Sequence, residues 1–517
     1  MHRTIVVLLA SLFLAACATT QPELVLTNGK VFTADDGRPW AEAVAIGGDR
    51  ILRVGTTAEI GALAGARTTR IDLGGRVVVP GINDAHVHEP WGSSTKSVKA
   101  PPRATPEQVL NAVRDAVAVE PAGTWLTASI APELQDDPAW TRAALDAIAP
   151  RHPVSLHSLG GHARLLNTAA LRAWNIGDGD PDPKGGRYGR ADGRLNGWVY
   201  EHALWVNDAR AVAALPDDTL VSSMREFAQE AMRFGITSVQ SMPLMSNNRA
   251  QRLEKQADVP LRWRWMEFQL GGVQARPTHT VKYVLDGTPI ERGAALRAPW
   301  VDRPQWSGAL NYTDADMRTM LEAAAQSDAQ LVLHISGDLP LQKLFALMQD
   351  VPANWPAKRL RIEHGDFMGG FLDEGARFQT VHVINPSHMM LPQLFAQRLD
   401  PARLKTFAAA RSVLARGIPL AIGSDGPINP WLNVMFATMN PANPAEALTR
   451  EQAILAYTRG SAFAERMETQ KGSLTPGKLA DLAVLSQDVF TVAPPELSKT
   501  QSVLTIIGGK IVLREGL

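Results

Sequence analysis

Hydrophobic and polar residues follow two different patterns along the chain. Near both ends, short apolar runs are separated by tight turns, as in LVLTNGKVFT and AVAIGGDRILRVG at the start and VLTIIGGKIVL at the end. Asn28-Gly29, Gly47-Gly48 and Gly508-Gly509 stand where hairpin turns require a positive φ. Because such runs bury little apolar surface alone, we expect residues 17–79 and 468–517 to fold together into one small β-domain.

Between the two ends, apolar strand-like runs alternate with helical stretches. Helices are predicted at Leu220–Phe234, Asp314–Ser327 and Leu404–Arg416. Parallel strands with helical crossovers predict an α/β fold, a (β/α)8 TIM barrel over residues 80–467. The eight predicted strands are Val77–His88, Ile236–Met242, Leu261–Phe268, Thr280–Gly287, Leu331–Gly337, Leu360–Asp366, Thr380–Ser387 and Pro419–Asp425.

Residues 92–219 are predicted to be an insertion between the first two strands of the barrel. The tract GDGDPDPKGGRYGRADGRLNG within it is rich in Gly and Asp and predicts a loop near the functional site. With residues 288–311, the insertion is expected to form the walls of a pocket. Tryptophans in these segments indicate either an apolar or aromatic substrate, or simple packing of the insertion on the barrel. They are Trp198, Trp205, Trp300 and Trp306.

Chemically reactive side chains stand near the carboxyl ends of the predicted strands, where the functional site of such a barrel lies. The first strand carries PGINDAHVH, whose two histidines lie on one face because side chains alternate along a strand. Others contain VKYVLDG, LVLHISGD, RLRIEHGDF and AIGSDGP. The candidate residues are His86, His88, Lys282, His334, His364 and Asp425.

Each candidate alone has an ordinary structural explanation. A strand histidine is usually a hydrogen-bonded core residue, a strand lysine usually extends to solvent, and Asp before Gly-Pro is usually in a turn. Together, these polar groups would be costly to bury without a partner, and one or two divalent metal ions supply that partner. Histidine and carboxylate ligands suit Zn²⁺, although Mn²⁺, Fe²⁺ and Co²⁺ fit too. We therefore expect a metal-dependent enzyme with a small-molecule substrate.

Length and charge narrow the class of protein further. A chain of 517 residues is long enough for a large domain and a smaller one. Lys plus Arg and Asp plus Glu both total 52, so the formal net charge is zero and no long basic run occurs. Since phosphate binding requires clustered Lys and Arg, a nucleic-acid partner is not expected. The oligomeric state stays open, with a homo-oligomer as one option.

The first residues, MHRTIVVLLASLFLAAC, predict a secretory signal over residues 1–16 because their apolar run is too short to span a bilayer. Leu14-Ala15-Ala16-Cys17 looks like a bacterial lipobox, which would make Cys17 the lipidated first residue of the mature protein. The alternative is an ordinary signal peptide with an incidental cysteine. Cys17 is the only cysteine, so no intrachain disulfide can form. By analogy with lipoprotein sorting, Ala18 favours the periplasmic face of the outer membrane, with the lipid anchor as the only membrane contact.

An ordered set of motifs resembles the amidohydrolase superfamily, and within it the YtcJ-like (amidohydrolase 3) metal-dependent hydrolases. The motifs run from residue 80 to residue 485 and are PGINDAHVH, GGHARLLNTAAL, VKYVLDGT, HISGD, RIEHGDF, INPSH, GSDGP and GKLADLAVL. The resemblance implies that the terminal β-runs form a composite β-sandwich. It also implies His86 and His88 on one metal, with Asp425 as a further ligand.

The same resemblance implies a second metal held by His334 and His364, with Lys282 as a bridging N-carboxylated lysine. Asp425 would act as the general acid–base between water and the leaving amine. His162, in GGHARLLN, would contact the substrate carbonyl oxygen, unless it is a surface-loop histidine. His388, in INPSH, stays unassigned.

The implied activity is hydrolysis of a non-peptide C–N bond of the amide, N-acyl or formamide type. Deamination is an alternative within the superfamily. The sequence argues against it, because such deaminases commonly carry a Glu three residues after the histidine of the fifth strand, whereas this chain has His334-Ile335-Ser336-Gly337. Ester or lactone hydrolysis uses the same machinery and stays an alternative. From a different class, an inactive solute-binding lipoprotein would be expected to lack metal ligands, and the motifs lack none.

Overall fold

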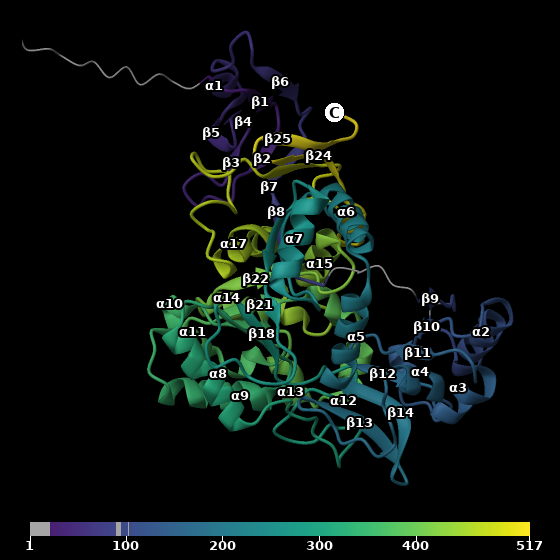
Figure 1. Cartoon of the computed structure of the whole chain (residues 1–517). Helices are drawn as coiled ribbons and strands as arrows, with labels where there is room; N and C mark the ends of the chain where they lie inside the picture. The colour runs from purple at the N-terminus through teal and green to yellow at the C-terminus, as the bar shows by residue number, and fades with distance from the viewer. Residues whose placement is uncertain (1–20, 89–94, 102) are drawn as a thin grey trace, which may run out of the picture.

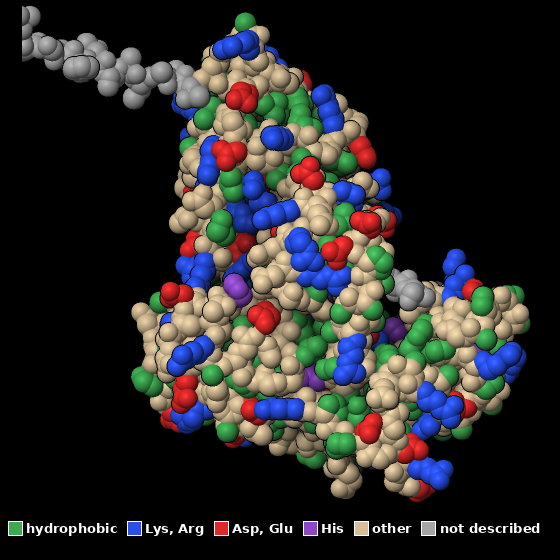
Figure 2. All heavy atoms as spheres, viewed as in Figure 1, with side chains coloured by type: hydrophobic (Ala, Val, Ile, Leu, Met, Phe, Trp, Pro, Cys, Tyr) green, Lys and Arg blue, Asp and Glu red, His purple; other side chains and the backbone are tan. Residues whose placement is uncertain are grey.

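The computed structural model describes residues 21–88, 95–101 and 103–517 (Figure 1). The predicted signal peptide and Cys17 lie outside these residues. Within the described part of the chain, no helix is long and apolar enough to cross a membrane. Acidic and basic side chains of the described residues are interspersed over the face shown in Figure 2, in keeping with the balanced charge of the sequence.

The central layer consists of parallel strands that run in the same order in space as in the sequence. They form two hydrogen-bonded sheets, β16-β15-β8 and β17 to β22, instead of the one closed sheet that the sequence predicts. Alternation of these strands with helices gives a TIM-barrel-type α/β fold. The strands are β8 (Ile82–Val87), β15 (Ile236–Ser241), β16 (Arg262–Trp265), β17 (Glu267–Phe268), β18 (Val281–Val284), β19 (Leu331–Ile335), β20 (Arg361–His364), β21 (Val381–Ile384) and β22 (Leu420–Ile422).

The last strand of this layer returns to the first. The backbone N–H of Asp425, just beyond β22, donates a hydrogen bond to the carbonyl of His86 at 2.9 Å. A Cβ added to Gly423 would lie only 2.4 Å from the His86 Cβ, so the close approach of the two segments requires glycine there. This contact brings the functional residues of the first and last strands together.

Two predicted strands are each divided in the structure. Val77–His88 splits at Gly81 into β7 (Val77–Pro80), which belongs to a different sheet, and β8. Pro80 has no N–H to donate, and the N–H of Gly81 bonds to the carbonyl of Asp481 at 2.8 Å, which directs the chain from one sheet into the other. Leu261–Phe268 likewise divides at Met266 into β16 and β17.

Both ends of the chain contribute to one six-stranded sheet, because β23 pairs with β7. Its order is β25-β24-β23-β7-β2-β3, and a four-stranded sheet, β5-β4-β1-β6, shares a hydrophobic cluster with it. These sheets lie at the top of Figure 1. The strands are β1 (Leu24–Thr27), β2 (Lys30–Phe32), β3 (Trp40–Ala41), β4 (Ala43–Gly47), β5 (Arg50–Gly55), β6 (Thr69–Asp72), β23 (Leu482–Leu485), β24 (Ser502–Ile507) and β25 (Lys510–Arg514).

The insertion folds around a mixed six-stranded sheet, β13-β14-β12-β11-β10-β9, at the right of Figure 1. The prediction of a loop for its Gly- and Asp-rich tract is wrong, since most of that tract forms the β13–β14 hairpin. Asp192 and Gly193 both have positive φ at its turn, which suits the twist of a hairpin. The elements are β9 (Lys96–Ser97), β10 (Leu126–Ser129), β11 (Val154–His157), β12 (Ala163–Leu166), β13 (Gly186–Ala191), β14 (Arg194–Glu201), α2 (Pro106–Val119), α3 (Arg142–Ile148), α4 (Thr168–Ala173) and α5 (His202–Ala214).

Two of the three predicted helices are confirmed, as α6 (Asp217–Arg233) and α8 (Asp314–Gln326). The third prediction, Leu404–Arg416, is wrong: α13 (Pro401–Thr406) and α14 (Ala410–Ala415) are separate. Ala408 between them has a positive φ and donates its N–H to the carbonyl of Asp366. The other helices are α1 (Thr57–Gly61), α7 (Asn247–Ala257), α9 (Asp338–Asp350), α10 (Trp355–Lys358), α11 (Leu372–Phe378), α12 (Pro392–Arg398), α15 (Pro430–Met439), α16 (Arg450–Leu455) and α17 (Ser461–Ala464).

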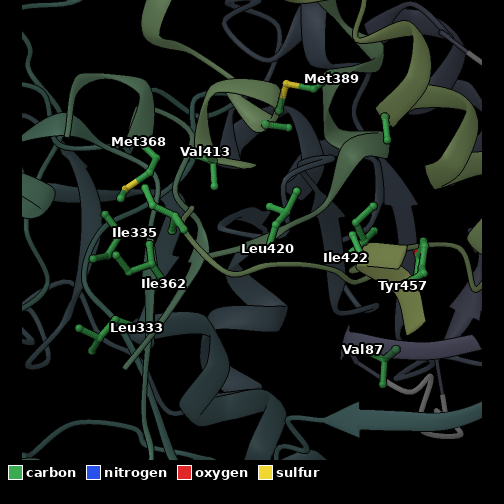
Figure 3. Close-up of a cluster of buried hydrophobic side chains, with 14 of the residues drawn as sticks. Val87, Leu333, Ile335, Ile362, Met368, Met389, Val413, Leu420, Ile422 and Tyr457 are labelled. Atoms are coloured by element: carbon green, nitrogen blue, oxygen red, sulfur yellow. The ribbon is translucent and has the colours of Figure 1, made fainter. Parts of the chain in front are cut away.

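One large hydrophobic cluster packs the helices against the parallel strands. Figure 3 shows part of it, with Leu333, Ile335 and Ile362 from neighbouring strands β19 and β20, and Leu420 and Ile422 from β22. These side chains are all at most 4% exposed. Because this packing fixes each strand, the polar residues at the strand ends are held in one place.

Candidate metal centre

Four predicted residues meet around one nitrogen atom, His86 Nε2. It lies 3.3 Å from His88 Nε2, 3.2 Å from Lys282 Nζ and 3.5 Å from Asp425 Oδ1. The side chains come from β8 and the residue directly after it, from β18 and from the segment after β22. His86 has no exposed surface and Lys282 is 2% exposed, whereas the His88 side chain is 40% exposed, so the cluster is buried on one side and open on the other.

His364 and His334 stand on the other side of this cluster. His364 Nε2 is 3.8 Å from Asp425 Oδ2, and the rings of His364 and His334 have centroids 4.3 Å apart. Burial lowers the pKa of both histidines well below the ordinary value, so both rings are neutral. The structure therefore brings together all six residues that the sequence predicts as ligands. We call these residues (His86, His88, Lys282, His334, His364 and Asp425) the candidate metal centre.

The donor atoms of the centre fit a divalent cation. One atom each from His86, His364 and Asp425 can be chosen so that all three lie within 4.8 Å of one another. The Nε2 atom of His334 is buried without any hydrogen-bond partner in the described structure. Burial of such a nitrogen is costly, and binding to a cation would offset that cost. Neutral imidazole nitrogens and a carboxylate are typical ligands of Zn²⁺ and of similar divalent metals.

The backbone at two of these residues is strained. His364 has a φ of 66° and Asp425 a φ of 42°, left-handed values that are uncommon for residues other than Gly. Strained conformations of this kind cluster at functional sites, where surrounding contacts hold them in place. At Asp425 the hydrogen bond from its N–H to the His86 carbonyl is one such contact.

Lys282 differs from an ordinary lysine because it lies within a fully buried strand. Burial, helped by the nearby Arg361, lowers the pKa of Lys282 to about 8, although Glu363 and Asp425 act in the opposite direction. The Lys282 side chain therefore becomes a neutral amine much more easily than a lysine in water does. N-carboxylation requires such an amine.

Burial favours the neutral form of Asp425, but the neighbouring His86 and His88 outweigh it and hold the pKa of this carboxyl well below its ordinary value. The carboxylate is consequently ionised. It also lies 3.7 Å from His388 Nε2, and this nitrogen is 3.2 Å from the Asp425 carbonyl oxygen. His388, unassigned from the sequence, thus stands beside the centre.

The motifs gave no role to Glu363 and Arg361, although Glu363 contacts the centre and Arg361 binds Glu363. Glu363 Oε2 accepts a hydrogen bond from His86 Nδ1 at 2.6 Å, and Arg361 Nε donates to Glu363 Oε1 at 2.9 Å. Neither side chain has any exposed surface. Because Nδ1 carries the proton, the lone pair of His86 is on Nε2, the atom that faces Lys282 and Asp425. A buried Arg-x-Glu pair in a central strand was the available signal in the sequence.

His162 lies in the interior, not on a surface loop. It is 8% exposed, and its ring centroid is 4.8 Å from that of His334. Its Nδ1 is 2.9 Å from Glu201 Oε2, a partner that the sequence did not indicate. Burial lowers the pKa of His162, but Glu201 outweighs it, and the pKa is raised overall.

Two cavities adjoin the centre. One of about 340 Å³, the centre cavity, is lined by metal-centre residues together with His162, Trp205 and Phe268. The other, of about 150 Å³, lies between the centre and an apolar wall. That wall includes Ile290, Met389, Met390, Leu391, Phe395 and Phe407.

Among the four tryptophans expected in the pocket, Trp205 lines the centre cavity. The others have packing roles instead, because Trp300 is 1% exposed in the main core while Trp198 and Trp306 pack against hydrophobic clusters. Residues 288–311 contribute Thr288, Pro289 and Ile290 to the smaller cavity. The walls near the centre are therefore apolar with a few polar groups, as in most small-molecule sites.

Comparison with known proteins agrees with this geometry. A model of the Amidohydrolase family (Amidohydro_3) matches residues 69–513. The chain is 27% identical over 489 residues to the putative amidohydrolase YtcJ of Bacillus subtilis, covering 86% of this chain and 90% of that protein. It is 26% identical over 544 residues to the N-substituted formamide deformylase of Arthrobacter pascens, covering 95% of this chain and 98% of that protein.

The fold is also found among solved structures. That of an uncharacterized metal-dependent hydrolase from Pyrococcus horikoshii aligns with a TM-score of 0.69, at 19% identity, over 91% of this chain and 99% of the other. At this identity the likeness concerns the fold alone. The family model, by contrast, spans most of the sequence and includes every residue of the metal centre. The chain therefore belongs to the amidohydrolase family, as its motifs predict, and is a hydrolase of that family.

Proposed function

We propose that the protein hydrolyses a non-peptide C–N bond of the amide, N-acyl or formamide type in a small molecule. The observation that carries this proposal is the convergence of six ligand-type side chains, from five segments of the chain, around His86 Nε2 and Asp425. Two metal ions, or one, would bind there, with His86, His88 and Asp425 on one side and His334 and His364 on the other. When bound, the metal would activate water and polarise the substrate carbonyl.

Lys282 would bridge the two sides as an N-carboxylated lysine. A carbamate offers two anionic oxygens, whereas an amine offers one lone pair and is protonated in water. The buried strand around Lys282 and the lowered pKa of its amine support this chemistry. Zn²⁺ is the first choice among metals, with Mn²⁺, Fe²⁺ and Co²⁺ as alternatives.

Asp425 is placed to move the proton that the reaction requires. Its ionised carboxylate would accept a proton from the attacking water and deliver it to the leaving nitrogen. This nitrogen must gain a proton because an amide anion is a very poor leaving group. His388 Nε2, bonded to the Asp425 carbonyl oxygen, would help to hold the carboxylate in position.

His162 would bind the carbonyl oxygen of the substrate. Glu201 occupies its Nδ1, and the ring lines both cavities beside the centre, which leaves Nε2 as the atom for the substrate. A donor at this place would stabilise the negative charge that develops on the oxygen during attack. The relative whose name describes a formamide deformylase supports formamides as the first substrates to test.

The test is hydrolysis of a panel of N-formyl and N-acyl amines, monitored by release of the amine. We expect turnover by the wild-type protein that a chelator abolishes and added Zn²⁺ restores, with Asp425→Asn inactive under the same conditions. If the protein hydrolyses esters or lactones but none of these amides, it is still a metal-dependent hydrolase, and the proposed specificity for C–N bonds is wrong. Turnover that survives both the chelator and Asp425→Asn would contradict the mechanism.

We also propose that the protein is anchored in the cell envelope by lipid on Cys17 and faces the periplasm. Support comes from the sequence alone, namely the signal-like residues 1–16 and the single cysteine at the end of LAAC. One diacylated cysteine would hold the hydrolase at the membrane surface, with the chemistry in the water phase.

A further inference from the structure

A second, larger cavity lies beside the centre cavity, between the sheet of the insertion and α5. It has a volume of about 660 Å³, within the range of small-molecule sites. Asp208 and Leu244 line both this cavity and the centre cavity, so the two adjoin at these residues. We call the larger one the aromatic cleft, because Trp125 and Trp174 form part of its wall with ring centroids 5.9 Å apart.

One wall runs continuously from the metal centre into the aromatic cleft. His162 and Arg164, two residues apart at β12, are on the same face of that strand, since side chains alternate. Opposite them, Trp205 and Asp208 lie about one turn apart on α5. His162 and Trp205 line the centre cavity, and Arg164 binds Asp208 through two hydrogen bonds of 2.6 and 2.8 Å at the junction.

The aromatic cleft contains polar atoms that lack a partner in the described structure. Ser155 Oγ and His157 Nε2, both from β11, are buried without a hydrogen bond. Ser155 is 2% exposed, so its hydroxyl is not simply bonded to bulk water. Burial, with Arg164 nearby, lowers the pKa of His157 to about 3, and the ring is therefore neutral. A buried polar atom without a partner is destabilising, and a ligand in the cleft would supply the missing bond.

The rest of the cleft combines one apolar and one polar side. The tryptophans, with Leu215 and Leu244, provide apolar surface, while Arg164, Asn207 and Arg210 provide hydrogen-bond donors. Flat ring systems pack well on indole faces, and donors at the edge would bind a polar substituent on such a ring.

We propose that the aromatic cleft binds the distal part of the substrate, a flat apolar ring system that carries a hydrogen-bonding group and is linked to the scissile C–N group by a flexible stem. This inference rests on the proposed function and adds a substrate class to it. The scissile group would lie beside His162 and Asp425, and the stem would pass Asp208 and Leu244.

The test compares N-formylbutylamine with its counterpart that has a naphthyl group at the end of the butyl chain. The two share the scissile bond and differ only in the ring. We expect wild-type protein to prefer the naphthyl compound, and Trp174→Ala to reduce that preference about tenfold, mainly through KM. Trp198→Ala is the matched control, because this indole belongs to the insertion and is not among the residues lining either cavity. It should leave the preference unchanged.

A second variant and a binding measurement distinguish failure of the cleft proposal from failure of the proposed function. Trp125→Leu changes the other indole and should have the same effect if Trp174→Ala does not fold. Calorimetric binding of naphthylbutanol to wild-type protein and to each variant reports on the cleft without any turnover. Binding that depends on Trp174 or Trp125, without hydrolysis of either formamide, would support the cleft while the proposed function fails. Equal preference in wild-type and both variants, or no naphthylbutanol binding, would overturn the inference.

Discussion

Glu363 Oε2 lies 2.6 Å from His86 Nδ1, and neither side chain has any exposed surface. Arg361 donates two hydrogen bonds to the same carboxylate, from Nε and Nη2, at 2.9 and 3.2 Å. Glu363 contacts the Nδ1 side of His86, and its neighbour His364, whose φ is 66°, lines the centre cavity. One strand thus supplies both a candidate ligand and the group that orients another ligand.

Glu363→Gln is therefore expected to weaken metal binding. The amide can still accept the hydrogen bond from Nδ1, but without the negative charge that makes His86 a stronger donor to the metal. Losses of this kind reduce metal affinity about 10- to 100-fold. Competition for Zn²⁺ with a chromophoric chelator measures the change. Glu465→Gln is the control, since Glu465 is also a buried carboxylate, paired with Lys471 at 2.7 Å and outside the centre. Equal affinities in the two variants would contradict the role given to Glu363.

Asp425→Asn should abolish most of the activity without unfolding the protein. Asn tolerates the positive φ at this position almost as well as Asp does, so the backbone can keep its course. The amide cannot take up the proton, and loss of a general acid–base lowers kcat about 10²- to 10⁴-fold. Circular dichroism and the melting temperature check the fold. A variant with wild-type kcat would show that another group moves the proton.

His162→Asn should lower kcat about 10²-fold if the imidazole stabilises charge on the substrate carbonyl oxygen. Metal content should stay at the wild-type level, because His162 is not among the proposed ligands. The measurement is steady-state kinetics on whichever formamide is turned over, combined with elemental analysis of the same sample. Loss of metal together with activity would instead make His162 a ligand.

Cys17→Ser should remove the lipid anchor from the full-length chain. The wild-type protein expressed in a Gram-negative host should incorporate labelled palmitate and sediment with outer membranes. The serine variant should take up no label and should be recovered without membranes, because the only acylation site is gone. Unlabelled wild-type protein would favour an ordinary signal peptide.

The six candidate ligands were predictable because each is a polar residue within or shortly after a segment with the pattern of a buried strand. The role of Glu363 was not predictable, because it depends on the contact with His86, 277 residues away in the sequence. Local patterns also failed where tertiary contacts override them. The Gly- and Asp-rich tract pairs as β13 and β14, and the predicted helix at Leu404–Arg416 is interrupted where Ala408 bonds to Asp366.

The tryptophans show the same limit. Sequence alone could not separate Trp205, which lines the centre cavity, from Trp300, which is buried in the main core. Trp125 and Trp174, in the insertion, carry no such signal in the sequence, because only the folded insertion brings them together in the aromatic cleft. The chemistry of the site was therefore clearer from the sequence than the shape of its pocket.

The most direct test of the account is the metal content per chain, measured on protein that starts after Cys17 and is purified without chelator. We expect about two equivalents in wild-type protein and about one or fewer in Lys282→Ala. Lys471→Ala, at a buried lysine outside the centre, should keep the wild-type content. If the wild-type protein and Lys282→Ala both hold one equivalent of metal, the proposed carbamate bridge is wrong, but the proposed metal-dependent hydrolase is not contradicted. No metal retained, and none taken up from added Zn²⁺, would contradict the metal centre itself.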